Sequence, residues 1–330
     1  METASVYVAN YCQRCGCRCR YCLLDWRGTC PGVPNHDAMD FTRRFAAWFA
    51  AQKHAPAFGY YAGYAMDLPE LREYLRFLRE IRSPQAGFLQ LNGMDLRTEE
   101  EMRAWLRAAR DGGADTLCPT FYGTRDYHDA FCARKGDFDN LMRLSELAAA
   151  GGFHLSVTYP ILRSNLHMAA EVVARCEELT DEIHVLSPHA KGRGRLLNGE
   201  RITLADLEQL PQTVRRRYSR QAKAERDWIR EGFPTPARRS LTLVLTRENF
   251  PALQAKPFEE TLAMLEELDD AYYAAMPSAE ELAAEYGDPD GTKLYRGRDL
   301  LLEWQQRYRE AHAPDLHDMQ DERHHFSVRY

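Results

Sequence analysis

Up to about residue 197 the chain alternates two hydrophobic patterns. Short runs rich in β-branched and aromatic residues are each followed by a longer stretch in which apolar residues recur every three or four positions. The runs that predict strands are 6–10, 58–62, 87–91, 116–121, 154–159 and 182–186. The stretches that predict helices are 41–53, 68–81, 99–110, 138–150 and 166–179. Strands that alternate with helices in this way are typical of an α/β protein with a parallel sheet.

From about residue 198 the pattern becomes mostly helical. Near 258–268 apolar residues stand at helical spacing with acidic residues between them, which predicts an amphipathic helix. One more strand is predicted at 241–245, and it either extends the parallel sheet or forms a small separate one. We therefore expect an α/β unit over 1–197 and a mostly helical C-terminal extension over 198–330, a candidate substrate lid or partner-binding region.

Six of the nine cysteines lie between Cys12 and Cys30, directly after the first predicted strand. Among them, Cys15, Cys19 and Cys22 have the spacing C-x3-C-x2-C. Three thiolates suit a four-iron cluster, because one iron then keeps an open position for a small molecule. Structural zinc is the alternative, since Cys12 and Cys15, then Cys19 and Cys22, also form two C-x2-C pairs. Only three residues separate these pairs, however, whereas zinc knuckles usually have roughly 15 to 20.

The residue before the last cysteine of the motif is aromatic, Tyr21. The stretch therefore resembles the signature C-x3-C-x-aromatic-C of the radical S-adenosylmethionine (radical SAM) superfamily. The resemblance implies a [4Fe-4S] cluster on the three motif cysteines, with Cys17 and Cys30 as non-ligands and Cys12 undecided. In that family the open iron chelates the amino and carboxylate groups of S-adenosylmethionine. One electron then cleaves this cofactor to a 5′-deoxyadenosyl radical, which takes a hydrogen atom from the substrate.

The resemblance also implies a fold, a partial (β/α)6 TIM-like barrel over 1–197. The cysteine loop follows the first strand, and in parallel barrels the chemistry lies at the C-terminal ends of the strands. Many relatives carry a cysteine-rich C-terminal module with additional clusters. Here no cysteine follows Cys176, so we expect a single cluster.

After the second strand, Ala62, Gly63, Tyr64 and Ala65 stand where the family usually has a Gly-Gly-Glu-Pro turn that holds the amino group of the cofactor. The glycine that allows close backbone approach is kept. The acidic side chain is missing, and Asp67 is at most an approximate substitute. This departure leaves backbone carbonyls to do the binding.

The ends of the later strands follow the family more closely. Taken with the cysteine motif and the turn after the second strand, the resemblance implies that eight residues contact the cofactor: Tyr21, Gly63, Tyr64, Asn92, Thr120, Arg163, Asn165 and Arg193. Cys118 precedes Thr120 by two residues and should share its face of the strand, which makes it a candidate hydrogen donor. Tyr122 is a second candidate catalytic residue. A buried cysteine that only fills space is the plainer interpretation of Cys118.

The loop around His128 and Asp129 resembles that of family branches that modify peptides and small molecules. A peptide substrate in natural-product maturation is therefore the first expectation, and a small metabolite the second. The resemblance further implies that the protein is an oxidoreductase and that its partner is an electron donor such as flavodoxin or ferredoxin. The alternative from another class is a non-catalytic iron–sulfur or zinc-binding protein with a partner-binding C-terminal region.

Charge and composition add few constraints. The formal net charge is −6, from 43 basic and 49 acidic residues, so we expect no nucleic-acid partner unless one binds a local patch. A basic stretch at 215–239 is such a patch; it either receives an acidic partner, such as a leader peptide or an RNA, or is neutralised by the acidic stretch 256–293. The N-terminus has no signal-peptide pattern, and the clustered cysteines suit a reducing compartment. We expect a cytoplasmic protein without a membrane partner.

Overall fold

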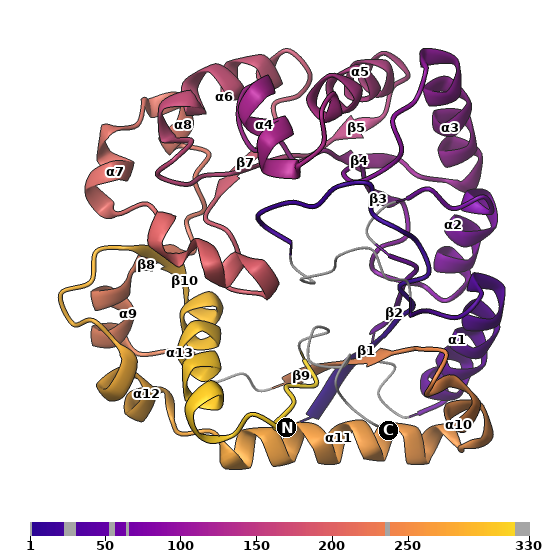
Figure 1. Ribbon diagram of the computed structural model, residues 1–330. Coiled ribbons are helices and arrows are strands. Elements are labelled where there is room, and N and C mark those ends of the chain that lie inside the picture. Colours follow the sequence, from indigo (N-terminus) through magenta and orange to yellow (C-terminus); the bar gives the residue numbers. More distant parts are fainter. Residues whose placement is uncertain (1, 23–30, 53–56, 64–65, 235–237, 321–330) are drawn as a thin grey trace.

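The computed structural model describes residues 2–22, 31–52, 57–63, 66–234 and 238–320. Its parallel strands stand around a central space, and most helices pack on their outer side (Figure 1). The strands in question are β1 (Glu2–Ala9), β2 (Ala57–Tyr61), β3 (Phe88–Gln90), β4 (Thr116–Cys118), β5 (His154–Leu155), β6 (Val157–Pro160), β7 (Ile183–Leu186) and β9 (Arg238–Val244). The helices between them are α1 (Asn35–Ala50), α2 (Leu71–Glu80), α3 (Glu99–Gly112), α4 (Arg125–Cys132), α5 (Asp137–Ala150) and α6 (Ala169–Glu177), with the 3₁₀ turn η1 (Leu166–Met168) before α6.

The strand pairing is parallel in each of these ladders. Strand β1 pairs with β2 and with β9, β4 pairs with β3 and β5, and β6 pairs with β7. The predicted α/β class with a parallel sheet is therefore confirmed. The described strands form separate ladders rather than one continuous sheet, so the finer count of six β/α units stays a prediction.

The fifth predicted strand, 154–159, is divided into β5 and β6. The reason is a change of neighbour: β5 continues the ladder of β4, whereas β6 pairs with β7. Helix α4 is missing from the sequence prediction. It has only two turns, with His128, Phe131 and Cys132 as its buried residues, and such a short element gives little periodic signal.

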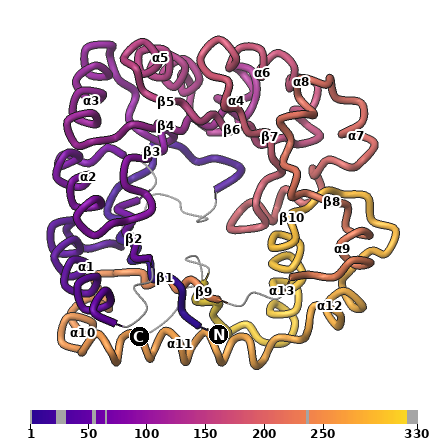
Figure 2. Tube along the Cα trace, turned by 180° about the vertical axis from the view of Figure 1, so that it is seen from behind, coloured from indigo at the N-terminus to yellow at the C-terminus, as the bar shows by residue number. Residues whose placement is uncertain are grey.

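The region after residue 198 is mostly helical, as expected, and contains further strands. Its elements are η2 (Gly192–Glu200, which begins earlier), α7 (Leu204–Gln209), α8 (Gln212–Arg215), β8 (Ala222–Ala224), α9 (Glu225–Glu231), α10 (Phe250–Ala255), α11 (Phe258–Ala275), α12 (Ala279–Tyr286), β10 (Leu294–Arg296) and α13 (Gly297–His312). Strands β8 and β10 form an antiparallel pair. Figure 2 shows the molecule from behind, with α7, α8, α9, α12 and α13 on the side of the ring opposite α2 and α3, and with α10 and α11 along the bottom of the view.

Strand β9 extends the sheet of β1, so the first of the two alternatives for the extra strand is correct. It pairs in parallel with β1 on the edge opposite β2, from Arg238 beside Glu2 to Val244 beside Ala9. Its residues Leu241 and Leu243 are fully buried. A strand buried in this way needs covering elements on both faces, which ties the extension to the α/β unit.

Ion pairs neutralise much of the basic stretch. Arg239 is 4% exposed, and its guanidinium binds the carboxylates of Asp269 and Asp270 on the acidic helix α11. Lys223 lies 2.6 Å from Glu231 within the stretch itself. Of these contacts, that of Arg239 is with the acidic stretch, and an acidic partner for the exposed rest of the basic stretch stays a prediction. None of the described helices has the length and apolar composition that crossing a bilayer requires.

Candidate functional site

The cysteine loop between β1 and α1 crosses the central space and is held by backbone hydrogen bonds to other elements (Figure 1). These bonds run from Gly16 N–H to Gly93 (2.6 Å), from Arg18 N–H to Cys132 (2.8 Å), from Arg20 N–H to Phe131 (2.9 Å), and from Arg193 N–H to Cys22 (2.8 Å). Cys132 and Phe131 end α4, where helix carbonyls have no partner within the helix. The loop thus supplies α4 with donors, and the helix end fixes the loop.

Tyr21 anchors the loop on its other side. Its ring is buried, and its hydroxyl accepts a 2.8 Å hydrogen bond from the backbone N–H of His189, just after β7. Burial raises the pKa of Tyr21, so the group stays a neutral phenol. A side chain at Gly194 would collide with this ring, which explains a glycine there. The predicted aromatic residue therefore positions the cysteine loop against the β7 loop.

A cavity of about 290 Å³ opens above the strand ends. Its walls contain seven residues named from the sequence: Cys15, Cys19, Cys22, Tyr21, Asn92, Thr120 and Tyr122. Further walls come from Gln13, Cys17, Gln90, Thr158 and His189, among others. The structure therefore brings the predicted metal ligands together with the predicted contacts of strands β3 and β4.

Asn92 and Thr120 hold one another at this cavity. The Asn92 side chain donates to the Thr120 carbonyl at 2.8 Å and accepts from the Thr120 N–H at 2.7 Å. Thr120 also forms a parallel bridge with Thr158. The amide of Asn92 is thus engaged in fixing the backbone after β4, and the side chains that this backbone carries are aimed into the cavity.

Several predicted contacts lie away from the cavity walls. Asn165 is fully buried, and its amide binds backbone groups of Leu162, Tyr122 and Pro160. Arg163 is exposed, with its Nε 3.4 Å from an oxygen of Asp206. Both residues shape the chain after β6, and the structure does not bring their side chains to the cysteines.

Gly63 has a φ of +135°, a conformation that side chains strongly disfavour, and lies against Gln13 of the cysteine loop. Tyr64 lies outside the described residues. Asp67 does not replace the missing acid, because its carboxylate accepts a 2.6 Å bond from Asp95 N–H and pairs with Arg97. The cavity therefore has no acidic side chain from this turn among the described residues.

Cys118 is buried in β4, opposite Gln90 of β3. Burial raises the pKa of its thiol to about 12. Gln90 lines the cavity and Cys118 does not. The role of a hydrogen donor for Cys118 stays a prediction, and of the two residues only Thr120 is a wall of the cavity.

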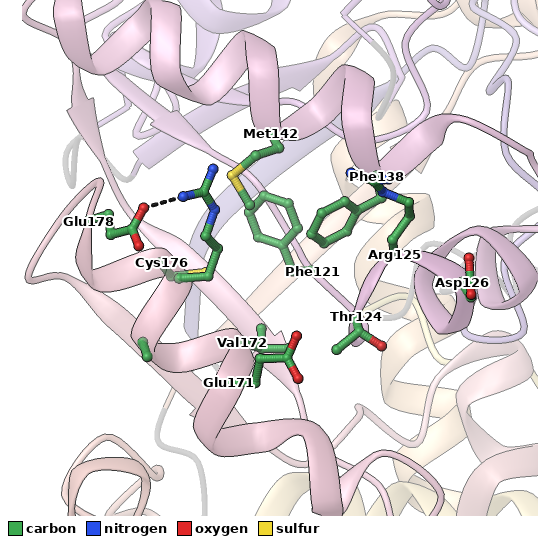
Figure 3. A pocket seen from close by; sticks show the side chains of 12 residues that line it. Phe121, Thr124, Arg125, Asp126, Phe138, Met142, Glu171, Val172, Cys176 and Glu178 are labelled. Atoms are coloured by element: carbon green, nitrogen blue, oxygen red, sulfur yellow. Dashed lines mark hydrogen bonds and ion pairs between the residues drawn. The ribbon is translucent and has the colours of Figure 1, made fainter.

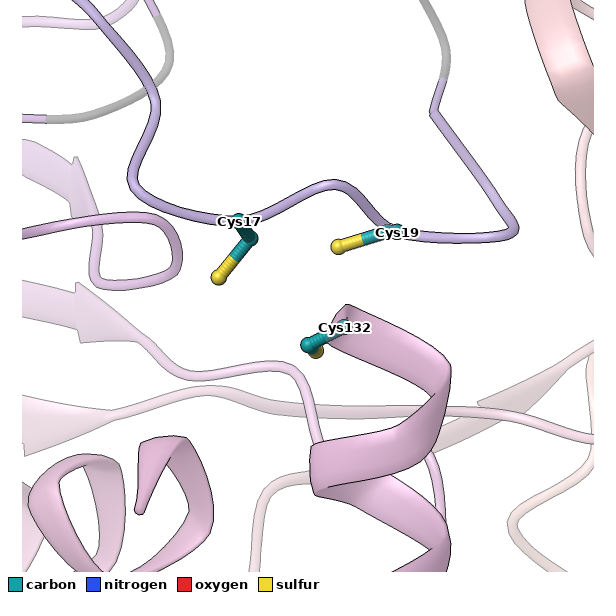
Figure 4. Close-up of side chains that lie close together, drawn as sticks. All are labelled: Cys17, Cys19 and Cys132. Atoms are coloured by element: carbon teal, nitrogen blue, oxygen red, sulfur yellow. The ribbon is translucent and has the colours of Figure 1, made fainter. Parts of the chain in front are cut away.

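A compact group of three thiols lies at the cavity wall, and two of them, Cys17 and Cys19, line the cavity. The sulfur atoms of Cys17, Cys19 and Cys132 are all within 4.8 Å of one another (Figure 4). Cys132 is fully buried and Cys17 is 5% exposed. The sequence analysis did not single out Cys132, because more than a hundred residues separate it from the motif.

A buried polar network adjoins these thiols. Asp137 accepts from His128 Nε2 at 3.0 Å, from Cys17 Sγ at 3.4 Å and from Arg134 Nε at 3.0 Å. Burial works against ionisation of this carboxyl, but the hydrogen bond from His128 and the charge and hydrogen bonds of Arg134 lower its pKa to about 2. Asp137 is therefore a buried carboxylate with each of its oxygens occupied.

His189 is a second residue that sequence reasoning missed. It lines the cavity, and its Nδ1 lies 3.3 Å from Asp299 of α13, a residue that also contacts Arg296 at 2.7 Å. Burial lowers the pKa of His189, and Asp299 partly opposes this. The sequence offered one signal for His189, its place three residues after the predicted strand 182–186. Its contact with Asp299, and thus the approach of α13 to the cavity, gave no signal in the sequence.

A larger cavity of about 640 Å³ lies on the outer side, between α4, α5 and α6 (Figure 3). Its floor is apolar, with Phe121, Phe138, Met142 and Val172, and charged side chains including Arg175 and Glu178 surround it. None of the predicted site residues lines it. The smaller cavity with the cysteines is therefore the candidate functional site.

The site is a sulfur-rich cavity at the C-terminal ends of parallel strands, the place where α/β barrels carry their chemistry. No protein-family model and no curated protein matches the chain. Among solved structures, SuiB of Streptococcus suis bound to precursor peptide SuiA is 13% identical with a TM-score of 0.46, over 63% of this chain and 44% of SuiB. Coproporphyrinogen III oxidase (HemN) from Escherichia coli, described as a radical SAM enzyme, is 16% identical with a TM-score of 0.43, over 75% of this chain and 64% of HemN.

A third similar structure, anSMEcpe with bound AdoMet and Cp18Cys peptide, is 14% identical with a TM-score of 0.40, over 56% of this chain and 51% of that chain. The matched part thus spans less than half of SuiB. All three are similar structures at 13–16% sequence identity, with TM-scores from 0.40 to 0.46.

Proposed function

We propose that this protein is a radical SAM enzyme with one [4Fe-4S] cluster on Cys15, Cys19 and Cys22. The observation that carries the proposal is the shared cavity, which these three thiols line together with Asn92 and Thr120. When bound and reduced, the cluster supplies the electron that cleaves S-adenosylmethionine to a 5′-deoxyadenosyl radical, which abstracts hydrogen from the substrate.

The three thiols suit a cluster better than a single ion. Cys15, Cys19 and Cys22 do not form a group within 4.8 Å, although they line one cavity. A zinc ion needs its ligands about 2.3 Å from one point, whereas a cube of four irons separates them further. Thiolates are the ligand form of cysteine in either kind of site.

The protein residues bind, orient and shield the cofactors in this proposal. Tyr21 fixes the cysteine loop to the β7 loop, and Asn92 fixes the backbone of Thr120, whose side chain lines the cavity. Tyr122 and His189 are further walls. Holding cofactor and substrate in one cavity excludes water and stray hydrogen donors from the radical.

The substrate in this proposal is a peptide or a small metabolite, and the electron donor is a flavodoxin or ferredoxin. The partial (β/α)6 barrel of 1–197 and the role of 198–330 as a lid or partner-binding region belong to the same proposal. His189 supports the latter, because Asp299 of α13 holds it at the cavity.

The test is anaerobic reconstitution followed by the cleavage assay. We expect the wild type to bind four irons per chain and to form 5′-deoxyadenosine from S-adenosylmethionine when reduced. Replacing Cys15, Cys19 or Cys22 by Ala should abolish both. Cys176→Ala, a buried thiol on α6, is the matched control and should retain both. Wild-type protein that binds no iron, or iron-loaded protein whose Cys15→Ala variant is unchanged, would refute the proposal.

A second candidate is a non-catalytic iron–sulfur or zinc-binding protein whose C-terminal region binds a partner. The observation that favours it is the turn after β2, which lacks the family acid while Asp67 is paired with Arg97. Calorimetry with S-adenosylmethionine on the iron-loaded protein separates the two candidates. Binding with cleavage supports the enzyme, and a loaded cluster without binding supports the alternative.

A further inference from the structure

The buried thiol of Cys132 faces the sulfur of a proposed cluster ligand. Cys132 is the last residue of α4 and is fully buried, and its sulfur lies within 4.8 Å of both Cys17 and Cys19 (Figure 4). The backbone brings it there, because Arg18 N–H binds the Cys132 carbonyl at 2.8 Å. The cysteine loop is thus docked on this residue by main chain and side chain together.

His128 does not accept the Cys132 proton. Its Nδ1 accepts the Tyr122 N–H at 3.2 Å, so this nitrogen carries no proton in the neutral ring. The proton is then on Nε2, which donates to Asp137 at 3.0 Å. Although Cys132 Sγ lies 3.6 Å from Nε2, that nitrogen has no lone pair to offer.

The thiol of Cys17 has its own acceptor. It donates to the Asp137 carboxylate at 3.4 Å, and the low pKa of that carboxyl keeps it an anion. The other sulfur atoms beside Cys132 among the described residues are those of Cys17 and Cys19, both within 4.8 Å. Cys19 is the acceptor in the proposed holoprotein, because a cysteine that binds a cluster does so as its thiolate.

We propose that Cys132 is a positioning residue that donates an S–H···S hydrogen bond to Cys19 and thereby raises the reduction potential of the cluster. This inference rests on the proposed function. Hydrogen bonds to the sulfurs are among the features that set the potential of an iron–sulfur cluster, and residues behind a ligand tune its basicity. A donor withdraws electron density from the ligand sulfur, so the reduced cluster is stabilised.

The hydrogen-bond network of His128 and Asp137 determines which sulfur atom is left to accept the Cys132 proton. By occupying the Cys17 proton, Asp137 leaves Cys19 as the acceptor for Cys132. Arg134 holds Asp137 in place through its Nε at 3.0 Å. The three thiols therefore have different tasks, with Cys19 as ligand, Cys132 as donor and Cys17 as the link to the buried carboxylate.

The experiment compares the reconstituted holoprotein with its Cys132→Ala and Cys132→Ser variants in a redox titration followed by electron paramagnetic resonance. We expect four irons per chain in all three proteins. In Cys132→Ala the equilibrium for cluster reduction should fall about tenfold, which is about 59 mV for a one-electron couple. The serine variant keeps a donor and should recover part of this shift. Cys176→Ala is the control and should leave the potential unchanged.

Three results would overturn the inference. An unchanged potential in Cys132→Ala at full iron content means that the thiol does not tune the cluster, and the proposed function survives. Loss of iron in both Cys132 variants means that the thiol is a ligand. Zinc in the wild type that is lost in Cys132→Ala means that the three thiols hold a mononuclear ion. A wild type that forms no cluster at all refutes the proposed function itself.

Discussion

Individual polar contacts decide how the sulfur atoms of this protein are used. Cys17 and Cys19 are separated by one residue, yet Cys17 donates to Asp137, while Cys19 lines the cavity beside the thiol of Cys132. The sequence motif assigned the ligand role to Cys19 and a non-ligand role to Cys17. The contacts give a physical reason for that difference, because the Cys17 thiol is engaged as a hydrogen-bond donor to a buried carboxylate.

Asp137→Asn tests this network through the pH dependence of stability. The folded-state pKa of Asp137 is about 2, lowered from 3.8, so its stabilising effect is full above the unfolded pKa and is lost as pH falls toward 2. We expect the cluster-free variant to lose about 2 kcal/mol of unfolding free energy at pH 7. The difference from wild type should shrink between pH 4 and pH 2. Urea titrations monitored by circular dichroism measure it, and a difference independent of pH would contradict the assignment.

At the scale of elements, the cysteine loop depends on the end of α4 and the loop after β3. Gly16 lies in this contact, and a side chain there would collide with the guanidinium of Arg134 and approach the Gly93 carbonyl to 3.1 Å. Arg134 cannot move away freely, because it binds both Asp137 and the Met94 carbonyl. The loop is therefore shaped by the packing of elements that lie far from it in sequence.

Gly16→Ala should displace the loop from β3 and lower cluster loading. We expect most of the bound iron to be lost after reconstitution, with the far-ultraviolet circular dichroism unchanged. Gly199→Ala is the matched control, since a Cβ at Gly199 meets no atom within 4 Å. Full iron binding by Gly16→Ala would show that the loop adapts to the added methyl group.

At the scale of the whole molecule, the C-terminal region is joined to the α/β unit at two places. Strand β9 lies beside β1 and is covered by α11, while Asp299 of α13 holds His189 at the cavity. The buried pair of Arg239 and Asp269 links β9 to α11. Removal of the region from residue 198 would therefore strip one edge of the parallel sheet.

Arg239→Met should destabilise the protein by roughly 3–5 kcal/mol, because it leaves the fully buried Asp269 without its cation. The neighbouring change Arg238→Met is the control: Arg238 is 66% exposed and its pair with Glu2, at 3.3 Å, is a surface contact. It should change stability by less than about 1 kcal/mol. Thermal and urea unfolding measure the stability of both variants. Equal losses would show that the buried ion pair stabilises the protein no more than the surface pair does.

The sequence alone determined the features that depend on local spacing. The C-x3-C-x2-C motif placed three thiols on one short loop, and the alternation of patterns predicted parallel strands with helices between them. The motif and the alternation each involve residues that are close in sequence. They can therefore be recognised without knowing which helices and strands pack together. The cavity walls Tyr21, Asn92 and Thr120 were named from the resemblance of short local motifs to the radical SAM family, and the structure places all three at the cavity.

The tertiary structure decided which distant side chains share the site. Cys132 reaches Cys19 only because α4 ends beneath the cysteine loop, and His189 reaches the cavity only because α13 supports it. Strand parity predicted that Cys118 shares the face of Thr120, yet Thr120 lines the cavity and Cys118 does not. Sequence periodicity fixes the direction of a side chain, whereas its neighbours depend on how separate elements pack, and that is a property of the folded chain as a whole.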